Sequence, residues 1–247
     1  MFHHPDDRVA LAQDAFAHLV HDAQTSVHQE HVFKLIFCLD GTLGMEADVV
    51  VDNVQAMMVA PGFKHRMWCR GQVLALFFSA QDPLVRAMVA HMRRPWTVLA
   101  PQKAIRLMHM ARGHVGHFQA DAVTGLMDEA RHIVGFHDLA PQRLDHRLLR
   151  VQAHILSQTH RQIPVAELAR VAAVSAPHLM RLFRQQVGTS LRAYGLWQRL
   201  LCAMAWMVNH PQGSITEAAL TAGFSDHAHL TRTCRRMFGQ PPSIIPR

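Results

Sequence analysis

The feature that most constrains this 247-residue chain is an internal repeat near its C-terminus. Residues 165–188 and 215–239 each hold a short helical pattern, a tight turn and a longer helical pattern ending in glycine. Residues 51 positions apart align the two copies: Leu179 with Leu230, Arg181 with Arg232, Arg184 with Arg235, and Gly188 with Gly239. Each copy is typical of a helix-turn-helix unit. The repeat therefore predicts an all-α C-terminal region with two such units, joined by a long helix over residues 191–208.

The distribution of charge divides the chain. Residues 1–140 hold 12 Lys/Arg and 14 Asp/Glu, a net charge of −2, whereas residues 141–247 hold 13 Arg, no Lys and four acids, a net charge of +9. Arginine forms bidentate contacts with phosphates and guanines. We therefore expect double-stranded DNA to be the partner of the C-terminal region.

The repeat also indicates which arginines contact DNA. In a helix-turn-helix unit, the N-terminal residues of the second helix meet base edges in the major groove. Arg181 and Arg232 lie one turn into their helices at equivalent positions, so we expect them to contact bases. Arg184 and Arg235 lie further along the same helices and are predicted phosphate contacts.

Residues 165–207 and 215–247 resemble the DNA-binding domain of AraC/XylS-type transcription regulators, most specifically in the stretches AGFSDHAHLTR and MFGQPPS. The base-reading residues implied by this resemblance are Ala176, Pro177, Met180 and Arg181 in the first unit, and His227, Ala228, Thr231 and Arg232 in the second.

The chain departs from the AraC/XylS pattern at three positions. Ala173 replaces a common turn glycine, Met180 replaces a polar base-reading residue, and Cys234 replaces an apolar aromatic. Apolar contact with thymine methyl groups would suit Met180, and a core position would suit Cys234.

The first third of the chain has a β pattern. Strands are predicted over 32–39, 49–51, 54–59 and 73–79, separated by Asp-Gly, Asp-Asn and Pro-Gly turn signals. Helical spacing begins at Pro83, and the methionine-rich helix faces suit either a core or a subunit interface. We predict an α+β chain with three parts: a sensor barrel (1–82), a helical dimerisation segment (83–140) and a DNA-binding domain (141–247).

The stretches HQEHVFKLIFCLDGTL (28–43) and VAPGFKHRMW (59–68) resemble the sensor domain of the same regulators. This resemblance implies a cupin-like β-barrel that takes a small-molecule effector, followed by helices that form a homodimer. His28, His31 and His65 are the predicted ligand-binding residues. Imidazoles suit a divalent metal, but the His-x-x-His spacing departs from the usual cupin His-x-His, and Glu30 is expected on the opposite strand face from His31. A divalent metal and an organic-ligand pocket therefore both stay open for these histidines.

Together these patterns predict a sequence-specific DNA-binding transcription regulator whose N-terminal domain senses a small ligand. The alternatives are a metal-dependent cupin enzyme or metal sensor fused to a DNA-binding domain, and a nonspecific nucleic-acid coat protein. The absence of a Ser/His/Asp or paired-carboxylate pattern argues against an enzyme. RNA polymerase is a candidate partner, and the sequence leaves open whether the chain activates or represses. Without a secretory signal or a long apolar run, we expect a cytoplasmic protein with no membrane partner.

Overall fold

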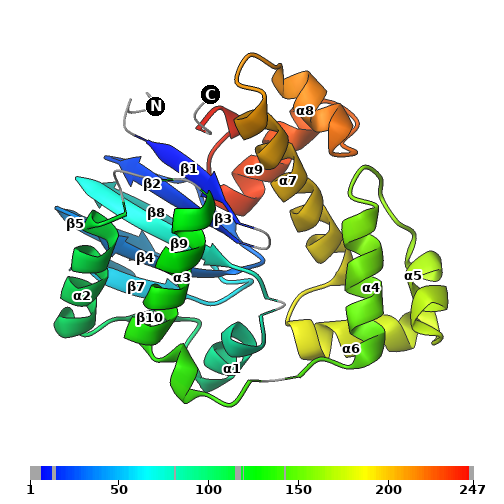
Figure 1. The fold of residues 1–247 in the computed structure, drawn as a ribbon, viewed down its shortest axis with the longest axis horizontal. Helices are drawn as coiled ribbons and strands as arrows, with labels where there is room; N and C mark the ends of the chain where they lie inside the picture. Colours follow the sequence, from blue (N-terminus) through cyan, green and yellow to red (C-terminus); the bar gives the residue numbers. More distant parts are fainter. Residues whose placement is uncertain are drawn as a thin grey trace.

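The computed structural model describes residues 7–12, 15–80, 82–114, 118, 120–141 and 143–244. The N-terminal half contains a six-stranded antiparallel sheet, in the order β1-β2-β9-β4-β7-β10, and a four-stranded sheet, in the order β3-β8-β5-β6 (Figure 1). The strands are β1 (Arg8–Leu11), β2 (Phe16–His21), β3 (His28–Gln29), β4 (Phe33–Cys38), β5 (Thr42–Glu46), β6 (Val50–Val54), β7 (Ala56–Val59), β8 (Lys64–Arg70), β9 (Gln72–Phe78) and β10 (Trp96–Val98).

Strand β4 is apolar at every position except Lys34, and its packing explains this composition. Successive side chains of a strand point to opposite faces. Phe33, Leu35 and Phe37 belong to a core shared with the helices, whereas Ile36 and Cys38 belong to a second core shared with the four-stranded sheet. Both faces of β4 are therefore covered, and every one of its residues is buried.

Three helices cover one face of the six-stranded sheet (Figure 1): α1 (Pro83–His91), α2 (Pro101–Arg112) and α3 (Ala120–Val134). Met88, Met110 and Met127 of these helices lie in the core with the sheet. These methionines therefore serve the core rather than a subunit interface, the two uses that the sequence left open. Strand β10 lies inside the segment predicted to be helical and pairs with β7. Helices α1, α2 and α3 and strand β10 are thus packed with the sheets rather than standing apart from them.

The predicted strands over 32–39 and 73–79 are β4 and β9, and those over 49–51 and 54–59 are β6 and β7. Strands β1, β2, β3, β5, β8 and β10 were not predicted from the sequence. The two sheets bear out the sheet-rich N-terminal fold, although the strand pairings among the described residues do not close a complete barrel.

The C-terminal half is helical, as predicted. Its elements are α4 (His146–Ser157), α5 (Val165–Ala172), α6 (Ala176–Val187), α7 (Leu191–Asn209), α8 (Ile215–Thr221), α9 (His227–Phe238) and a 3-10 turn at Pro242–Ile244. An earlier 3-10 turn, at Phe136–Asp138, follows α3. The two predicted helix-turn-helix units are α5–α6 and α8–α9, and α7 is the long connecting helix. Among the described residues, none of the helices combines the length and apolar character that a membrane span requires.

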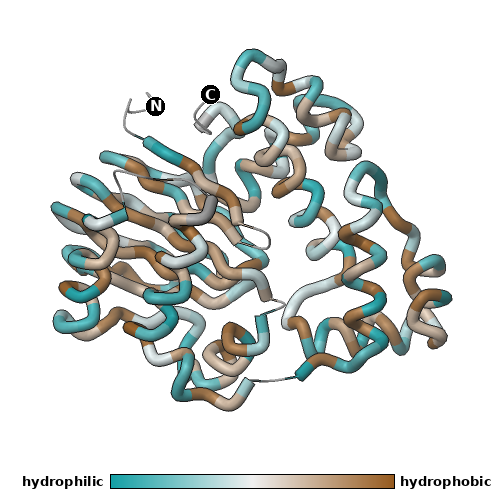
Figure 2. The backbone as a smooth tube through the Cα atoms, viewed as in Figure 1, coloured by the Kyte–Doolittle hydropathy of each residue, from teal (hydrophilic) through white to brown (hydrophobic). Residues whose placement is uncertain are grey.

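The two units have different cores. Apolar residues of α4, α5, α6 and the start of α7 form a cluster of their own, with Ala80 as the single buried contribution from the sheet domain. The remainder of α7, together with α8 and α9, belongs to the cluster that fills the space between the two sheets. Figure 2 shows apolar segments along the strands and along the inner sides of the helices, with hydrophilic residues at the outer turns.

Candidate DNA-binding helices and effector pocket

The second helices of the two units, α6 and α9, begin and end in the same way. Ser175 and Asp226 cap them, and each side chain accepts a hydrogen bond from a backbone N–H in the first turn. The hydrogen bond from the His229 N–H, at 2.6 Å, is the main reason that the pKa of Asp226 lies below its ordinary value. Gly188 and Gly239 end the helices in left-handed conformation.

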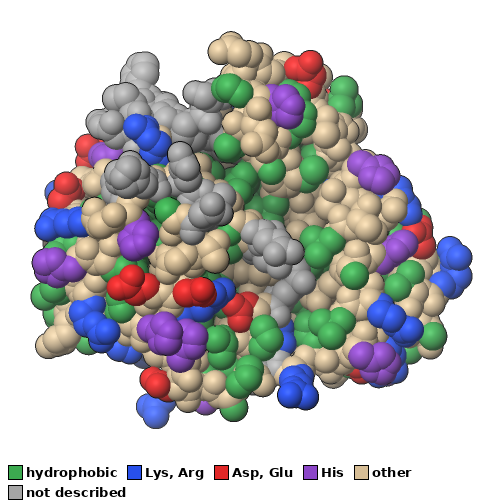
Figure 3. Space-filling view, viewed as in Figure 1, with side chains coloured by type: hydrophobic (Ala, Val, Ile, Leu, Met, Phe, Trp, Pro, Cys, Tyr) green, Lys and Arg blue, Asp and Glu red, His purple; other side chains and the backbone are tan. Residues whose placement is uncertain are grey.

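The predicted DNA contacts lie on the outward faces of these helices. Arg181 and Arg232 are both exposed, at the equivalent positions that the repeat predicted. Pro177, Met180, Arg184, His227 and Arg235 are exposed as well, while Ala176, Ala228 and Thr231 are half-buried. In the view of Figure 3, Lys, Arg and His side chains lie over the outer surface of α4, α5 and α6.

Two of the three residues that depart from the AraC/XylS pattern have distinctive local environments. Ala173 ends α5 with φ of +55°, the left-handed conformation for which glycine is favoured. Cys234 is 2% exposed inside the core, as its replacement of an aromatic residue suggested. Burial raises the pKa of its thiol to about 12.

A pocket lies between the two sheets and the C-terminal end of α9. Its cavity volume is about 70 Å³, and it opens to solvent. Its walls are mostly apolar side chains of β2, β4, β8 and β9, including Val20, Ile36 and Phe77, and its polar wall contains His28, Glu30 and Lys34. Phe238 and Gln240 complete the wall from the second helix-turn-helix unit, so both halves of the chain build this pocket.

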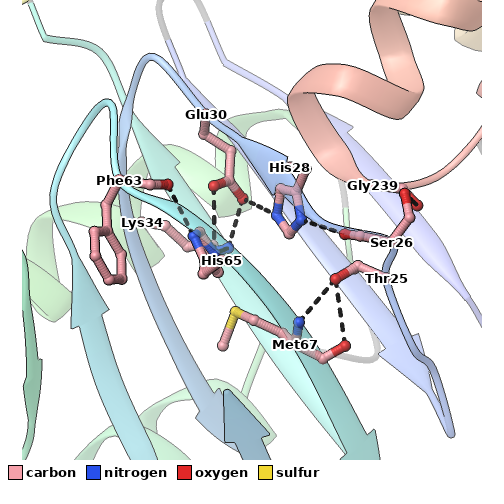
Figure 4. Close-up of polar contacts among 9 residues, drawn as sticks. All are labelled: Thr25, Ser26, His28, Glu30, Lys34, Phe63, His65, Met67 and Gly239. Atoms are coloured by element: carbon pink, nitrogen blue, oxygen red, sulfur yellow. Dashed lines mark hydrogen bonds and ion pairs between the residues drawn. The ribbon is translucent and has the colours of Figure 1, made fainter. Parts of the chain in front are cut away.

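The polar wall is a compact buried cluster (Figure 4). Lys34 Nζ donates to Glu30 Oε1 at 2.5 Å and to His65 Nε2 at 2.9 Å. His28 Nε2 lies 3.0 Å from Glu30 Oε1, and His65 Nε2 lies 3.5 Å from Glu30 Oε2. All four side chains are at most 4% exposed.

The pKa shifts in this cluster follow from burial and from the paired charges. Burial alone would raise the pKa of Glu30, but the charges of His28 and Lys34 outweigh it and hold that pKa well below the ordinary value. Burial lowers the pKa of Lys34 against the opposing attraction of Glu30. Burial, and then the charge of Lys34, lowers the pKa of His65 to about 3. The cluster thus combines the Glu30 carboxylate and the Lys34 ammonium with the neutral imidazole of His65.

The structure brings together His28 and His65 but not His31. His31 Nδ1 lies 3.2 Å from the hydroxyl of Thr189, at the start of the segment after α6. Burial, and then the charge of Arg236, lowers the pKa of His31. Sequence reasoning missed Lys34 and left Glu30 out of the predicted ligand-binding residues, although Glu30 lies two residues beyond His28 and therefore shares its strand face.

The cluster also contacts the second unit. His28 Nδ1 donates to the Ser26 carbonyl at 2.9 Å. The Ser26 N–H and hydroxyl both donate to the Gly239 carbonyl, at 3.0 and 2.9 Å, directly after α9 (Figure 4). A chain of hydrogen bonds therefore runs from the pocket wall to the C-terminal end of α9, the second helix predicted to contact bases.

Comparisons with known proteins agree with this arrangement. Residues 168–245 match the family model described as a helix-turn-helix domain. The chain is 35% identical over 100 residues to the HTH-type transcriptional regulator GlxA of Rhizobium meliloti, covering 40% of this chain and 31% of GlxA. It is 32% identical over 88 residues to the uncharacterized HTH-type transcriptional regulator YbfP of Bacillus subtilis, covering 36% of this chain and 30% of YbfP. The matches thus span about a third of the length of these curated relatives.

The whole fold is similar to that of ToxT from Vibrio cholerae. A crystal structure of a single-residue variant of ToxT in its apo form matches with a TM-score of 0.61 at 9% identity, covering 95% of this chain and 97% of that one. A structure of wild-type ToxT with a bound unsaturated fatty acid matches with a TM-score of 0.59 at 9% identity, covering 94% of each chain. At this identity the likeness shows a shared fold. Residues 168–245 thus match a helix-turn-helix domain family, and the chain as a whole has a fold similar to that of ToxT.

Proposed function

We propose that this chain is a sequence-specific DNA-binding transcription regulator whose N-terminal domain binds a small-molecule effector. This proposal rests on two exposed arginines, Arg181 and Arg232. They lie at equivalent positions of α6 and α9, two capped helices whose units are connected by α7. Two base-contacting helices joined through one connecting helix favour discrimination between DNA sequences, which a uniformly basic surface does not provide.

The proposed effector is a small molecule with an apolar body and a hydrogen-bonding end. The apolar walls around Val20, Ile36 and Phe77 suit the body, and the Glu30–Lys34 pair suits the polar end. The fatty acid bound to ToxT, which shares the fold, supports an effector of this amphipathic kind.

Selection of binding sites from random duplex DNA, followed by competition with unrelated DNA at physiological salt, tests the DNA-binding proposal. The expected result is a preferred sequence bound at least about 10³-fold more tightly than unrelated DNA. Equal affinities for all duplexes would instead identify a nonspecific coat protein.

A thermal-shift screen of small carboxylic acids, alcohols and aromatic metabolites tests the effector proposal. A molecule that binds the folded chain raises its melting temperature. Ala75 lines the pocket and is 4% exposed, so Ala75→Phe should fill the space and remove the shift. Binding that is unchanged in Ala75→Phe would place the effector elsewhere.

We also propose a homodimer formed through residues 83–140, with RNA polymerase as a further candidate partner. The buried methionines of these helices face the sheet, so the dimer surface must use outward residues such as Ile105, which is 51% exposed. Sedimentation equilibrium of the intact chain and of Ile105→Glu tests this. A wild-type chain that stays monomeric at micromolar concentration would contradict the homodimer.

A further inference from the structure

The buried cluster beside the pocket has the architecture of a metal site. His28 and His65 are direct partners in the β3–β8 pair, and Glu30 shares their sheet face. Ligand atoms of these three residues all lie within 4.8 Å of one another. Two imidazoles and a carboxylate are a common ligand set for divalent transition metals.

The hydrogen bonds of the two histidines strengthen this likeness. His28 Nδ1 contacts the Ser26 carbonyl at 2.9 Å, and His65 Nδ1 contacts the Phe63 carbonyl at 3.0 Å. Because a carbonyl oxygen only accepts, each Nδ1 carries a proton. Each Nε2 faces the Glu30 carboxylate (Figure 4), and the Nε2 of His28, at 3.0 Å, donates to it, because an ionised carboxylate also only accepts. Histidines that ligate metals are oriented in this way, by donating the other ring N–H to a backbone carbonyl.

Lys34 already places a positive charge against these three ligands. It enters from β4, in the opposite sheet, and its Nζ contacts both Glu30 Oε1 and His65 Nε2. The lysine side chain is 4% exposed, so water does not screen its charge. A divalent ion held by the three ligands would lie within a few ångströms of this ammonium, and the two positive charges would repel. The wild-type residues therefore do not fit a metal.

We propose that Lys34 takes the place of a metal ion in the site formed by His28, Glu30 and His65. It excludes divalent ions from the wild-type site, and Lys34→Met converts the site into one that binds zinc or cobalt. Methionine has a similar length and no charge, so it removes the competing cation while keeping the buried volume. The exclusion of metal by Lys34 does not depend on the proposed regulatory function.

Cobalt titration of the purified full-length chain, followed by visible absorption, tests the proposal. The 20 histidines of the chain will bind some metal elsewhere, so the readout is a difference between variants. Lys34→Met should bind one more equivalent than wild type, and Lys34→Met combined with Glu30→Gln should lose it. Lys64→Met is the matched control, because Lys64 is an exposed lysine directly before His65, and it should behave as wild type.

Thermal unfolding gives a second readout. Without metal, Lys34→Met leaves the buried Glu30 carboxylate without its ammonium partner, so the melting temperature of this variant should fall. Zinc at about 100 times its dissociation constant should raise that temperature by about 5–10 °C in Lys34→Met, and by no comparable amount in wild type or Lys64→Met.

Two results would overturn the proposal. One is a folded Lys34→Met protein that gains no equivalent of metal. The other is a wild-type chain that already binds metal at this site. Glu30→Gln in the wild-type background would reveal such binding by lowering the metal stoichiometry. The second measurement decides the matter even where Lys34→Met fails to fold.

Discussion

The two helix-turn-helix units repeat one motif, yet they are supported differently. The unit α5–α6 packs around its own core, and its contact with the sheet domain includes the His31–Thr189 hydrogen bond. The unit α8–α9 shares its core with the space between the two sheets. There, Phe238 makes edge contacts with the rings of Phe16 and Phe77, at centroid distances of 5.4 and 5.8 Å.

This difference suggests how one end of the chain could influence the other. Effector binding can shift a conformational equilibrium only if the effector contacts the two states differently. Phe238 and Gln240 form part of the pocket wall, so an effector there contacts the end of α9 directly. The first unit has no residue among those that line this pocket. The second unit is therefore the one expected to respond to the effector.

The largest effect that separates the units is expected at their terminal glycines. Gly188 and Gly239 have φ of +78° and +71°, so alanine is strained by about 1–2 kcal/mol at either position. A Cβ on Gly188 would meet nothing within 4 Å, whereas one on Gly239 would lie 2.6 Å from the Ser26 carbonyl oxygen. Gly239→Ala should therefore lose about 1–3 kcal/mol more of the free energy of unfolding than Gly188→Ala.

Urea denaturation of both variants measures this difference, and limited proteolysis shows whether α9 has left the sheet domain. Equal losses in the two variants would mean that the Ser26–Gly239 contact does not hold the second unit in solution.

The second comparison concerns DNA affinity. Arg181→Ala and Arg232→Ala should each weaken binding to the preferred duplex by about 1–3 kcal/mol, because each removes a proposed bidentate contact with a base. The loss should be much smaller on unrelated DNA. Titrations at fixed salt measure both quantities, and Arg150→Ala, an exposed arginine on α4, is the control. A loss that is equal on every DNA sequence would identify a phosphate contact instead.

The sequence predicted the C-terminal half more completely than the N-terminal half, and the reason is physical. Helical periodicity, caps and a repeat are local signals, so α5–α6 and α8–α9 could be placed from residue order alone. Strands β4 and β9 were recognisable because both of their faces are buried. Strand β8 was missed although its buried residues alternate with more exposed ones, because its basic side chains obscure the pattern.

The buried cluster depends on strand register, which residue order does not reveal. Glu30 joins His28 and His65 because β3 pairs with β8, and Lys34 reaches them only because the two sheets face each other. The spacing of the histidines alone suggested His31 as the third member. Contacts across sheets could be found only from the folded chain.

A smaller effect is expected at the turn of each unit. Ala173 holds φ of +55° on the surface, so Ala173→Gly should relieve strain of about 1–2 kcal/mol. The greater freedom of glycine in the unfolded chain offsets about 0.4–1 kcal/mol of that gain. A net stabilisation of up to about 1.6 kcal/mol is therefore expected, measured by urea denaturation.

The matching turn of the second unit should respond in the opposite direction. Gly223 has φ of +70°, and a Cβ there would lie 2.3 Å from the His160 carbonyl oxygen. Gly223→Ala should therefore destabilise the chain. A destabilised Ala173→Gly variant would show that the left-handed alanine is not strained.

The last prediction concerns the exposure of the second unit, followed through the reactivity of cysteine thiols. Burial raises the pKa of the Cys38 and Cys234 thiols to about 12 and also raises that of Cys69, whereas Cys202 is only half-buried. A thiol reacts as its thiolate, so at pH 8 a maleimide should modify Cys202 first in the folded chain. Mass spectrometry of the peptides follows each site. Cys234 labelling should be faster in Gly239→Ala and unchanged in Gly188→Ala, and an effector in the pocket should slow it. Equal rates in both variants would mean that α9 opens independently of its contact with Ser26, and the two units would then differ in their cores but not in their coupling to the sheet domain.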